Sequence, residues 1–104
     1  MSKQLERLVP QWEKTTGLYC VECKTRYMTT RWGTCNLKSK RIWINLQMVE
    51  KPIECLEYII LHELVHLKVS NHGSDFSDMM DKFMPEWKDR KNLLNTRILD
   101  NYKK

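Results

Sequence analysis

The stretch YIILHELVHLKV, residues 58–69, decides how this sequence folds. It contains neither glycine nor proline, and its apolar residues run almost without interruption, so it predicts a long buried helix. We expect this helix to extend from about Ile53 to Val69, with Pro52 at a favourable position for its first turn. The polar residues inside this apolar stretch are therefore the first candidates for a functional site.

Two histidines and a glutamate are the polar residues at the centre of this helix. His62 and His66 are four residues apart, so their side chains lie on one helix face, one turn above the other. That spacing lets two imidazole nitrogens bind one zinc ion at about 2.0–2.1 Å each. Glu63 projects beside such a metal and can accept a proton from a water that the metal activates. This is the His-Glu-x-x-His arrangement of zinc-dependent hydrolases, in which the glutamate is the base.

The remaining histidine of the chain, His72, is the natural third ligand. A catalytic zinc usually has three protein ligands and keeps its fourth position open. His72 follows His66 by six residues, and the offsets of the three histidines equal those of the metzincin pattern. The glycine of that pattern is replaced here by Val69, so we expect the helix to end at Ser70–Asn71, where asparagine can adopt a left-handed conformation. The chain is therefore not placed among the metzincins.

The alternative to a metal site is a buried helix that happens to carry histidines. Burying a carboxylate and two imidazoles without partners is strongly unfavourable. No lysine or arginine occurs on the helix before Lys68, so no ion pair on this element compensates Glu63. A metal ion supplies the missing partners. The sequence therefore favours one Zn²⁺ per chain held by His62, His66 and His72, with Asp75 or Asp78 as the alternative third ligand.

The N-terminal half of the chain predicts one helix followed by a small sheet. Ser2 can cap the helix, Pro10 interrupts its pattern, and Gly17 is a plausible end. Residues 18–49 are rich in aromatic and β-branched residues, and in RIWIN the two isoleucines fall on one strand face and Trp43 and Asn45 on the other. This composition predicts two or three antiparallel strands.

Two further helices follow the histidine-bearing one. The first is capped by Ser74 or Asp75, and the second runs from about Glu86 towards Tyr102. The second helix is expected to turn four apolar residues inward, namely Trp87, Leu94, Ile98 and Leu99. The order of helix, small sheet and three helices predicts an α+β fold and a single domain spanning residues 1–104.

Composition limits where this protein acts. No run approaches the roughly 20 apolar residues that span a bilayer, and the N-terminus lacks the apolar segment of a signal peptide. We therefore expect a cytoplasmic protein without a membrane partner. The formal net charge of +5 agrees with a solvated basic surface, and it leaves nucleotides or nucleic acid open as partners.

The four cysteines do not form a recognisable metal framework. Cys20 and Cys23 make one C-x-x-C pair, but no second pair follows, which disfavours a structural zinc ribbon. In a strand, residues three apart point to opposite faces, so a strand at Val21–Tyr27 would also separate these thiols. We interpret the cysteines as reduced and mostly buried.

Several separated stretches carry a resemblance to a known family. They comprise RWGTCN (31–36), RIWINLQMV (41–49), EYIILHELVHLKVSNHGSDF (57–76) and FMPEWKDRKNLL (83–94). Between about Lys24 and Leu94 the chain resembles the YgjP-like metallopeptidase domain, a minimal zincin related to SprT-like proteins. Two positions depart from the family pattern: Thr34 replaces a serine, and Ser77 stands where an aromatic residue is favoured.

The resemblance implies the same site residues as the spacing does. His62, His66 and His72 correspond to zinc ligands, and Glu63 corresponds to the catalytic base. It also implies a minimal zincin-like fold, with the N-terminal helix behind a small antiparallel sheet and the metal-binding helix beneath it.

The leading functional hypothesis is a zinc-dependent peptidase. An extended peptide or protein substrate would add as a strand to the edge of the sheet, and we expect Arg41–Gln47 to be that edge. The developing oxyanion needs a further donor, for which Arg31 and Tyr27 are candidates. Both are candidates for substrate binding.

Two alternatives stay open at this point. The same activated water attacks phosphoanhydrides, and four basic residues could hold the phosphates of a nucleotide: Arg31, Lys38, Lys40 and Arg41. No glycine-rich phosphate loop is present, which weakens this alternative. The third hypothesis is a zinc-containing module that binds nucleic acid and has only vestigial activity. Glu63 argues against it, because a structural zinc needs no general base.

Overall fold

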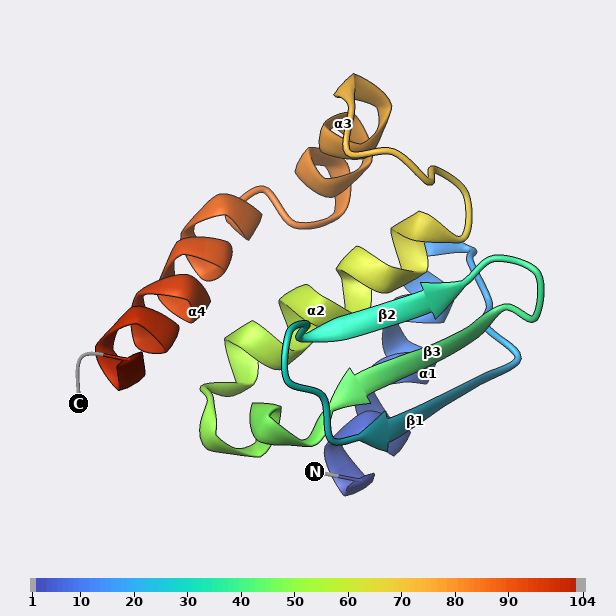
Figure 1. The fold of residues 1–104 in the computed structure, drawn as a ribbon. Helices are drawn as coiled ribbons and strands as arrows, with labels where there is room; N and C mark the ends of the chain where they lie inside the picture. Colours follow the sequence, from blue (N-terminus) through green and yellow to red (C-terminus); the bar gives the residue numbers. More distant parts are fainter. Residues whose placement is uncertain (1, 103–104) are drawn as a thin grey trace.

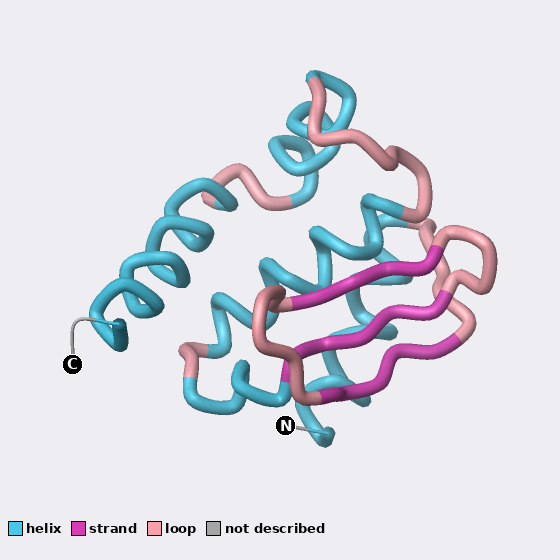
Figure 2. Tube along the Cα trace, viewed as in Figure 1, coloured by secondary structure: helices cyan, strands magenta, loops and turns pink. Residues whose placement is uncertain are grey.

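A computed structural model describes the backbone of residues 2–102 and the side chains of residues 3–95. Within this range the chain forms four α-helices and one three-stranded sheet, which confirms the predicted α+β class. The prediction for Ile98 and Leu99 lies outside the described side chains. Figure 1 shows α1 (Ser2–Thr16) and α2 (Ile53–His66) behind the sheet, and Figure 2 separates the helices from the strands.

The first helix, α1, runs without a break to its predicted end. It continues through Pro10, so the expected interruption is wrong. Pro10 removes only one backbone donor, and the burial of Leu5, Leu8 and Val9 holds the helix together on both sides of it. The predicted end is confirmed, because Gly17 has a φ of 75° that favours glycine and its N–H donates to the Glu13 carbonyl at 2.8 Å.

The sheet consists of β1 (Glu22–Arg26), β2 (Gly33–Asn36) and β3 (Arg41–Asn45), in the spatial order β1-β3-β2. β2 pairs with β3 antiparallel, but β1 pairs with β3 parallel, so the prediction of a purely antiparallel sheet is wrong. β3 lies in the middle because it is the most apolar strand, with Ile42 and Ile44 fully buried. The alternation of residues predicts strands, but it does not fix their order or direction.

This order changes which strand is available to a substrate. β3 has a partner on each side, so the prediction that Arg41–Gln47 is the edge strand is wrong. The edge beside α2 is β2 instead, and Figure 1 shows β2 running along that helix. Residues 46–50 leave the sheet as a short 3-10 helix rather than continuing β3.

α2 is the central element of the core. Nine of its side chains are buried, among them Ile60, Leu61, Leu64 and Val65. The helix ends at His66, earlier than the predicted Ser70–Asn71, and Val69 N–H donates to the Val65 carbonyl at 2.9 Å. Among the described non-glycine residues only Lys40 has a positive φ, so Asn71 does not adopt the predicted left-handed conformation.

The C-terminal helices cover the side of α2 that the sheet leaves open. α3 (Ser74–Phe83) starts after Gly73 without a side-chain cap, so neither Ser74 nor Asp75 has the predicted capping role. α4 (Trp87–Tyr102) packs along α2, and an ion pair between Arg90 and Glu57 at 3.5 Å links the two helices. Through residues 2–102, each helix is either too short or too polar to reach across a bilayer.

Candidate metal centre

Three histidine nitrogens converge where α2 ends. His62 and His66 project from one face of α2, and the connection to α3 brings His72 back onto them. The Nε2 atom of His72 lies 2.9 Å from Nε2 of His66 and 3.2 Å from Nε2 of His62. These three are the described side chains whose arrangement could hold a metal ion, since their ligand atoms all lie within 4.8 Å of one another.

Hydrogen bonds to the other ring nitrogens orient two of these imidazoles. Nδ1 of His66 lies 3.1 Å from the Val69 carbonyl oxygen, which can only accept. Nδ1 of His62 lies 3.1 Å from a carboxylate oxygen of Glu63. Both Nδ1 atoms therefore donate a proton, and both Nε2 atoms point a lone pair at the centre of the cluster. This is the tautomer that metal-binding histidines adopt, with a carbonyl or carboxylate behind the ring.

The surroundings of His66 and His72 favour the neutral form of these two rings. The pKa of His66 is lowered, first by burial and then by the neighbouring imidazole of His62. The pKa of His72 is lowered for the same two reasons, with a smaller effect from Lys91. A neutral imidazole is the form that binds a metal. Three lone pairs this close repel one another unless a proton or a cation lies between them.

The donor set fits zinc. Three ligands at about 2.0–2.1 Å in a tetrahedral arrangement would be separated by about 3.3 Å. The observed 2.9 and 3.2 Å differ from that spacing by a few tenths of an ångström. Imidazole nitrogen is also a preferred ligand of zinc, and three such ligands leave one coordination position open.

Glu63 lies beside the three nitrogens and is buried. Its side chain lines the same hollow as the histidines, a space of about 250 Å³. It is only 3% exposed, and its partner among the described residues is the His62 ring rather than a lysine or arginine. The carboxylate is thus held beside the histidines without a lysine or arginine partner among the described residues.

β2 closes this hollow from the other side. A side chain at Gly33 would lie 2.9 Å from Ile59 and 3.1 Å from a carboxylate oxygen of Glu63. Glycine is therefore needed at the start of β2 so that the edge strand can approach α2 closely. Thr34, Cys35 and Leu37 continue the wall along β2 and the turn after it.

The aromatic wall behind the histidines was missed by sequence reasoning. The Phe76 ring of α3 lies 4.8–5.1 Å from all three imidazole rings, and it is buried. Tyr58 lies one turn before His62 on α2. Its ring contacts the His62 imidazole edge-on and stacks on the Trp87 ring of α4. The sequence signal for Phe76 was its position on the inward face of α3, which indicates packing and does not specify against what.

The structure separates the two predicted substrate-binding residues. Arg31 lines the hollow that contains the histidines, together with Gly33 and Thr34. Tyr27 lies outside it and lines a neighbouring hollow of about 330 Å³, which also contains Arg31 and Thr34. Arg31 therefore belongs to both spaces, whereas Tyr27 borders only the second.

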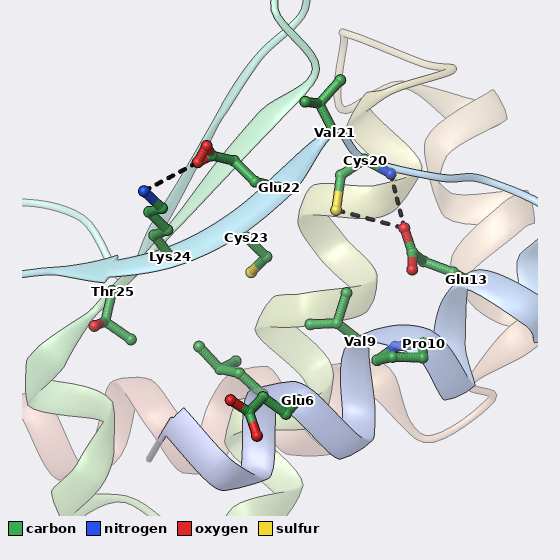
Figure 3. Close-up of a pocket in the computed structure, with 11 residues that line it drawn as sticks. Glu6, Val9, Pro10, Glu13, Cys20, Val21, Glu22, Cys23, Lys24 and Thr25 are labelled. Atoms are coloured by element: carbon green, nitrogen blue, oxygen red, sulfur yellow. Dashed lines mark hydrogen bonds and ion pairs between the residues drawn. The ribbon is translucent and has the colours of Figure 1, made fainter.

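The largest hollow described, about 560 Å³, lies elsewhere, between α1 and β1 (Figure 3). Cys20 and Cys23 both line it, because Cys20 precedes β1 and the strand alternation does not separate them as predicted. The Cys20 thiol lies 3.5 Å from the Glu13 carboxylate. Burial is the main cause that raises the pKa of each thiol to about 12, so both are protonated at neutral pH. Of the described cysteines, three are half-buried and Cys55 is buried.

Comparison with known proteins identifies the family. The sequence profile of the YgjP-like metallopeptidase domain matches residues 1–97. No curated protein matches the chain.

Two solved structures share the fold. One is the metallopeptidase zymogen abylysin of Pyrococcus abyssi, with a TM-score of 0.82, 24% identity and coverage of 91% of this chain and 95% of that one. The other is the metallopeptidase zymogen jannalysin of Methanocaldococcus jannaschii, with a TM-score of 0.79, 23% identity and coverage of 90% and 96%. At these identities the likeness concerns the fold.

Proposed function

This chain belongs to the YgjP-like metallopeptidase domain family, and we propose that it is a zinc-dependent peptidase that uses Glu63 as general base. His62, His66 and His72 would hold one zinc ion. The observation that carries the proposal is the convergence of three imidazole nitrogens beside a buried carboxylate that has no lysine or arginine partner among the described residues. The two metallopeptidase zymogens that share the fold agree with this reaction class.

The residues divide the chemistry between them. A bound zinc supplies a Lewis acid that polarises the scissile carbonyl and lowers the pKa of a water. Glu63 takes the proton of the attacking water and passes it to the nitrogen of the leaving amine, so the base is regenerated in each turnover. The hydrogen bond from His62 to Glu63 keeps this carboxylate oriented towards the hollow.

An extended substrate has a natural place along β2. This strand is the sheet edge beside the metal centre, and Thr34 and Cys35 in it line the hollow. A peptide that adds to this edge uses the free backbone groups of β2 and runs past the three histidines. Backbone pairing of this kind selects for extended, unfolded segments rather than for one side chain.

The phosphoanhydride alternative receives less support than the sequence suggested. Lys38, Lys40 and Arg41 do not line the hollow of the histidines, and Arg41 pairs with Glu22 at 3.5 Å. Arg31 is the one residue of the four predicted phosphate ligands that lines it. The nucleic-acid hypothesis rests on the net charge of +5, and no feature of the described residues gives it further support.

A comparison of two substrates and one variant tests the proposal. Zinc-loaded protein should cleave an unfolded protein such as casein, and Glu63→Gln should lose at least 10²-fold of that activity because the general base is gone. The variant should bind zinc as the parent does. Hydrolysis of nucleoside triphosphates that disappears in Glu63→Gln, without any peptide cleavage, would contradict the proposal and support the phosphoanhydride alternative.

A further inference from the structure

Arg31 lies where two hollows meet. It lines the space that contains His62, His66, His72 and Glu63, and it also lines the neighbouring space of about 330 Å³. Thr34 on β2 is the other residue that borders both. A substrate that lies along β2 and extends beyond Gly33, the first residue of the strand, therefore passes from the histidine cluster to the Arg31 side chain.

The neighbouring hollow has the chemistry of an anion site. Its lining contains no acidic residue. It combines the guanidinium groups of Arg26 and Arg31 with the hydroxyl groups of Tyr27, Thr29, Thr30 and Thr34. Arg26 is already engaged over the Trp43 ring, with its guanidinium carbon 5.0 Å from the ring centroid. Arg31 has no ion pair with any described carboxylate and is exposed. Its guanidinium group is therefore available to a ligand.

The backbone that carries Arg31 is fixed, although the side chain is exposed. Buried Asn45 donates from Nδ2 to the carbonyls of Arg31 at 2.7 Å and Met28 at 2.8 Å. Gln47 adds a donor to the Met28 carbonyl at 3.0 Å, and Asn45 N–H donates to the Trp32 carbonyl at 2.9 Å. A loop held from both ends in this way presents its arginine at one place, which a recognition site requires.

The direction of β2 tells on which side of the cleavage site Arg31 lies. β2 runs from Gly33 to Asn36, so Arg31 precedes its first residue. A peptide that pairs antiparallel with β2 runs the opposite way, and its C-terminal part lies towards Arg31. For a peptide bound in this antiparallel way at the histidine cluster, the part that follows the scissile bond is the part that meets the guanidinium group.

We propose that Arg31 binds a carboxylate of the substrate on the C-terminal side of the scissile bond. This inference rests on the proposed peptidase function. The carboxylate comes either from an aspartate or glutamate side chain or from a free C-terminus, and a guanidinium group binds both in the same bidentate way. The protein is thereby a peptidase with a preference for substrates that carry a carboxylate shortly after the scissile bond.

Peptides that differ at one position test this specificity. A quenched fluorescent peptide carries Glu, Gln or Lys at the first or second residue after the bond that mass spectrometry shows to be cut, each with a free or an amidated C-terminus. Zinc-loaded protein should cleave the Glu peptides with a kcat/KM about tenfold above that of the Gln peptides. If free C-termini are preferred over amidated ones equally for Glu and Gln peptides, the site binds the terminal carboxylate. If Glu peptides are preferred over Gln peptides after amidation as well, the site binds the acidic side chain.

Variants of Arg31 give the decisive comparison. Arg31→Gln should bring Glu and Gln peptides to the same kcat/KM, and Arg31→Glu should make Lys peptides the preferred ones. Both keep the Arg31 carbonyl that Asn45 binds, so the loop is retained. Arg7→Gln is the matched control, since Arg7 is exposed on α1 and lines neither hollow, and it should leave the preference unchanged.

The proposal is overturned if Arg31→Gln keeps the preference for Glu. It is also overturned if this variant lowers kcat equally for all peptides, because Arg31 would then stabilise the oxyanion. The affinity of the same peptides for the zinc-loaded Glu63→Gln variant separates binding of the substrate carboxylate by Arg31 from an effect of Arg31 on the chemical step. If no peptide is cleaved, the peptidase function fails, while the binding series with and without Arg31→Gln still decides whether Arg31 selects a carboxylate.

Discussion

At the scale of single residues, His72 completes a cluster that α2 alone cannot form. His62 and His66 are placed by one helix, so their spacing is fixed by helix geometry. His72 lies in the connection between α2 and α3 and is exposed, and only the path of the chain brings its Nε2 atom to 2.9 Å from His66. The geometry of the cluster therefore depends on this connection as much as on the helix.

His72→Ala should weaken zinc binding by more than the 10–100-fold that is typical for loss of a residue behind a ligand. The reason is that a direct ligand is removed while the two helical ligands remain. Competition with a chromophoric chelator measures the affinity, and the neighbouring exposed Asn71→Ala serves as the control. An affinity unchanged by His72→Ala would show that Asp75 or Asp78 supplies the third ligand.

The residue-scale predictions from the sequence were limited by what a helix determines locally. The spacing of four residues brought His62 and His66 together, and the buried setting of Glu63 followed from its apolar neighbours. The Val69 carbonyl behind His66 and the Phe76 ring against all three histidines depend on where α2 ends and how α3 packs. Such tertiary contacts leave no periodic pattern in the sequence.

At the scale of elements, the contact between β2 and α2 forms the cleft. Gly33 lets the edge strand lie directly against Ile59 and Glu63, where a methyl group would be 2.9 Å from the nearest side-chain atom. That distance is shorter than carbon atoms tolerate, so either β2 or the two side chains must move when glycine is replaced. The width of the cleft and the position of the Glu63 carboxylate are thus set by one residue.

Gly33→Ala should lower the free energy of unfolding by about 1–3 kcal/mol, as overpacking does in other cores. It should also lower peptidase activity, because displacement of Glu63 moves the base. Urea unfolding and kcat measure the two effects. Gly73→Ala is the control for stability, since a side chain there meets nothing within 4 Å. Unchanged stability and activity in Gly33→Ala would show that β2 does not constrain the cleft.

The elements themselves were predictable, but the pairing of the strands was not. RIWIN is rich in β-branched and aromatic residues, which indicates a strand, and its burial is what places β3 in the middle of the sheet. The outer strands β1 and β2 run in opposite directions, so the central strand β3 is antiparallel to β2 and parallel to β1. Strand order is a property of the whole chain path, so local residue patterns could not identify β2 as the edge.

At the scale of the whole molecule, burial raises the pKa of three thiol groups and one phenol group. Burial is the main cause that raises the pKa of Cys20 and Cys23 from 9.0 to about 12, that of Cys35 from 9.0 to about 11, and that of Tyr58 from 10.0 to about 12. The unfolded chain releases these protons first as pH rises. Folding therefore favours the protonated groups, and the associated stability is present below pH 9 and lost above it.

We expect the free energy of unfolding to fall by roughly 1–2 kcal/mol between pH 9 and pH 10, with the partial exposure of the thiols taken into account. Urea unfolding under reducing conditions at pH 8, 9 and 10 measures this. The double variant Cys20→Ser, Cys23→Ser should reduce the slope, because serine does not ionise in this range. Stability that stays constant or rises from pH 8 to pH 10 would show that burial of these thiols and of Tyr58 does not control the pH dependence.

Single residues, elements and the path of the chain all support the proposal that the three histidines hold one zinc ion that makes this chain a peptidase. Titration of metal-free protein with zinc, while peptide cleavage is recorded, tests it most directly. Activity should start near zero, rise in proportion to added zinc and level off at one equivalent per chain, whereas Glu63→Gln should bind the same equivalent without gaining activity. Cleavage that persists in metal-free protein, or that does not respond to zinc, would contradict the claim.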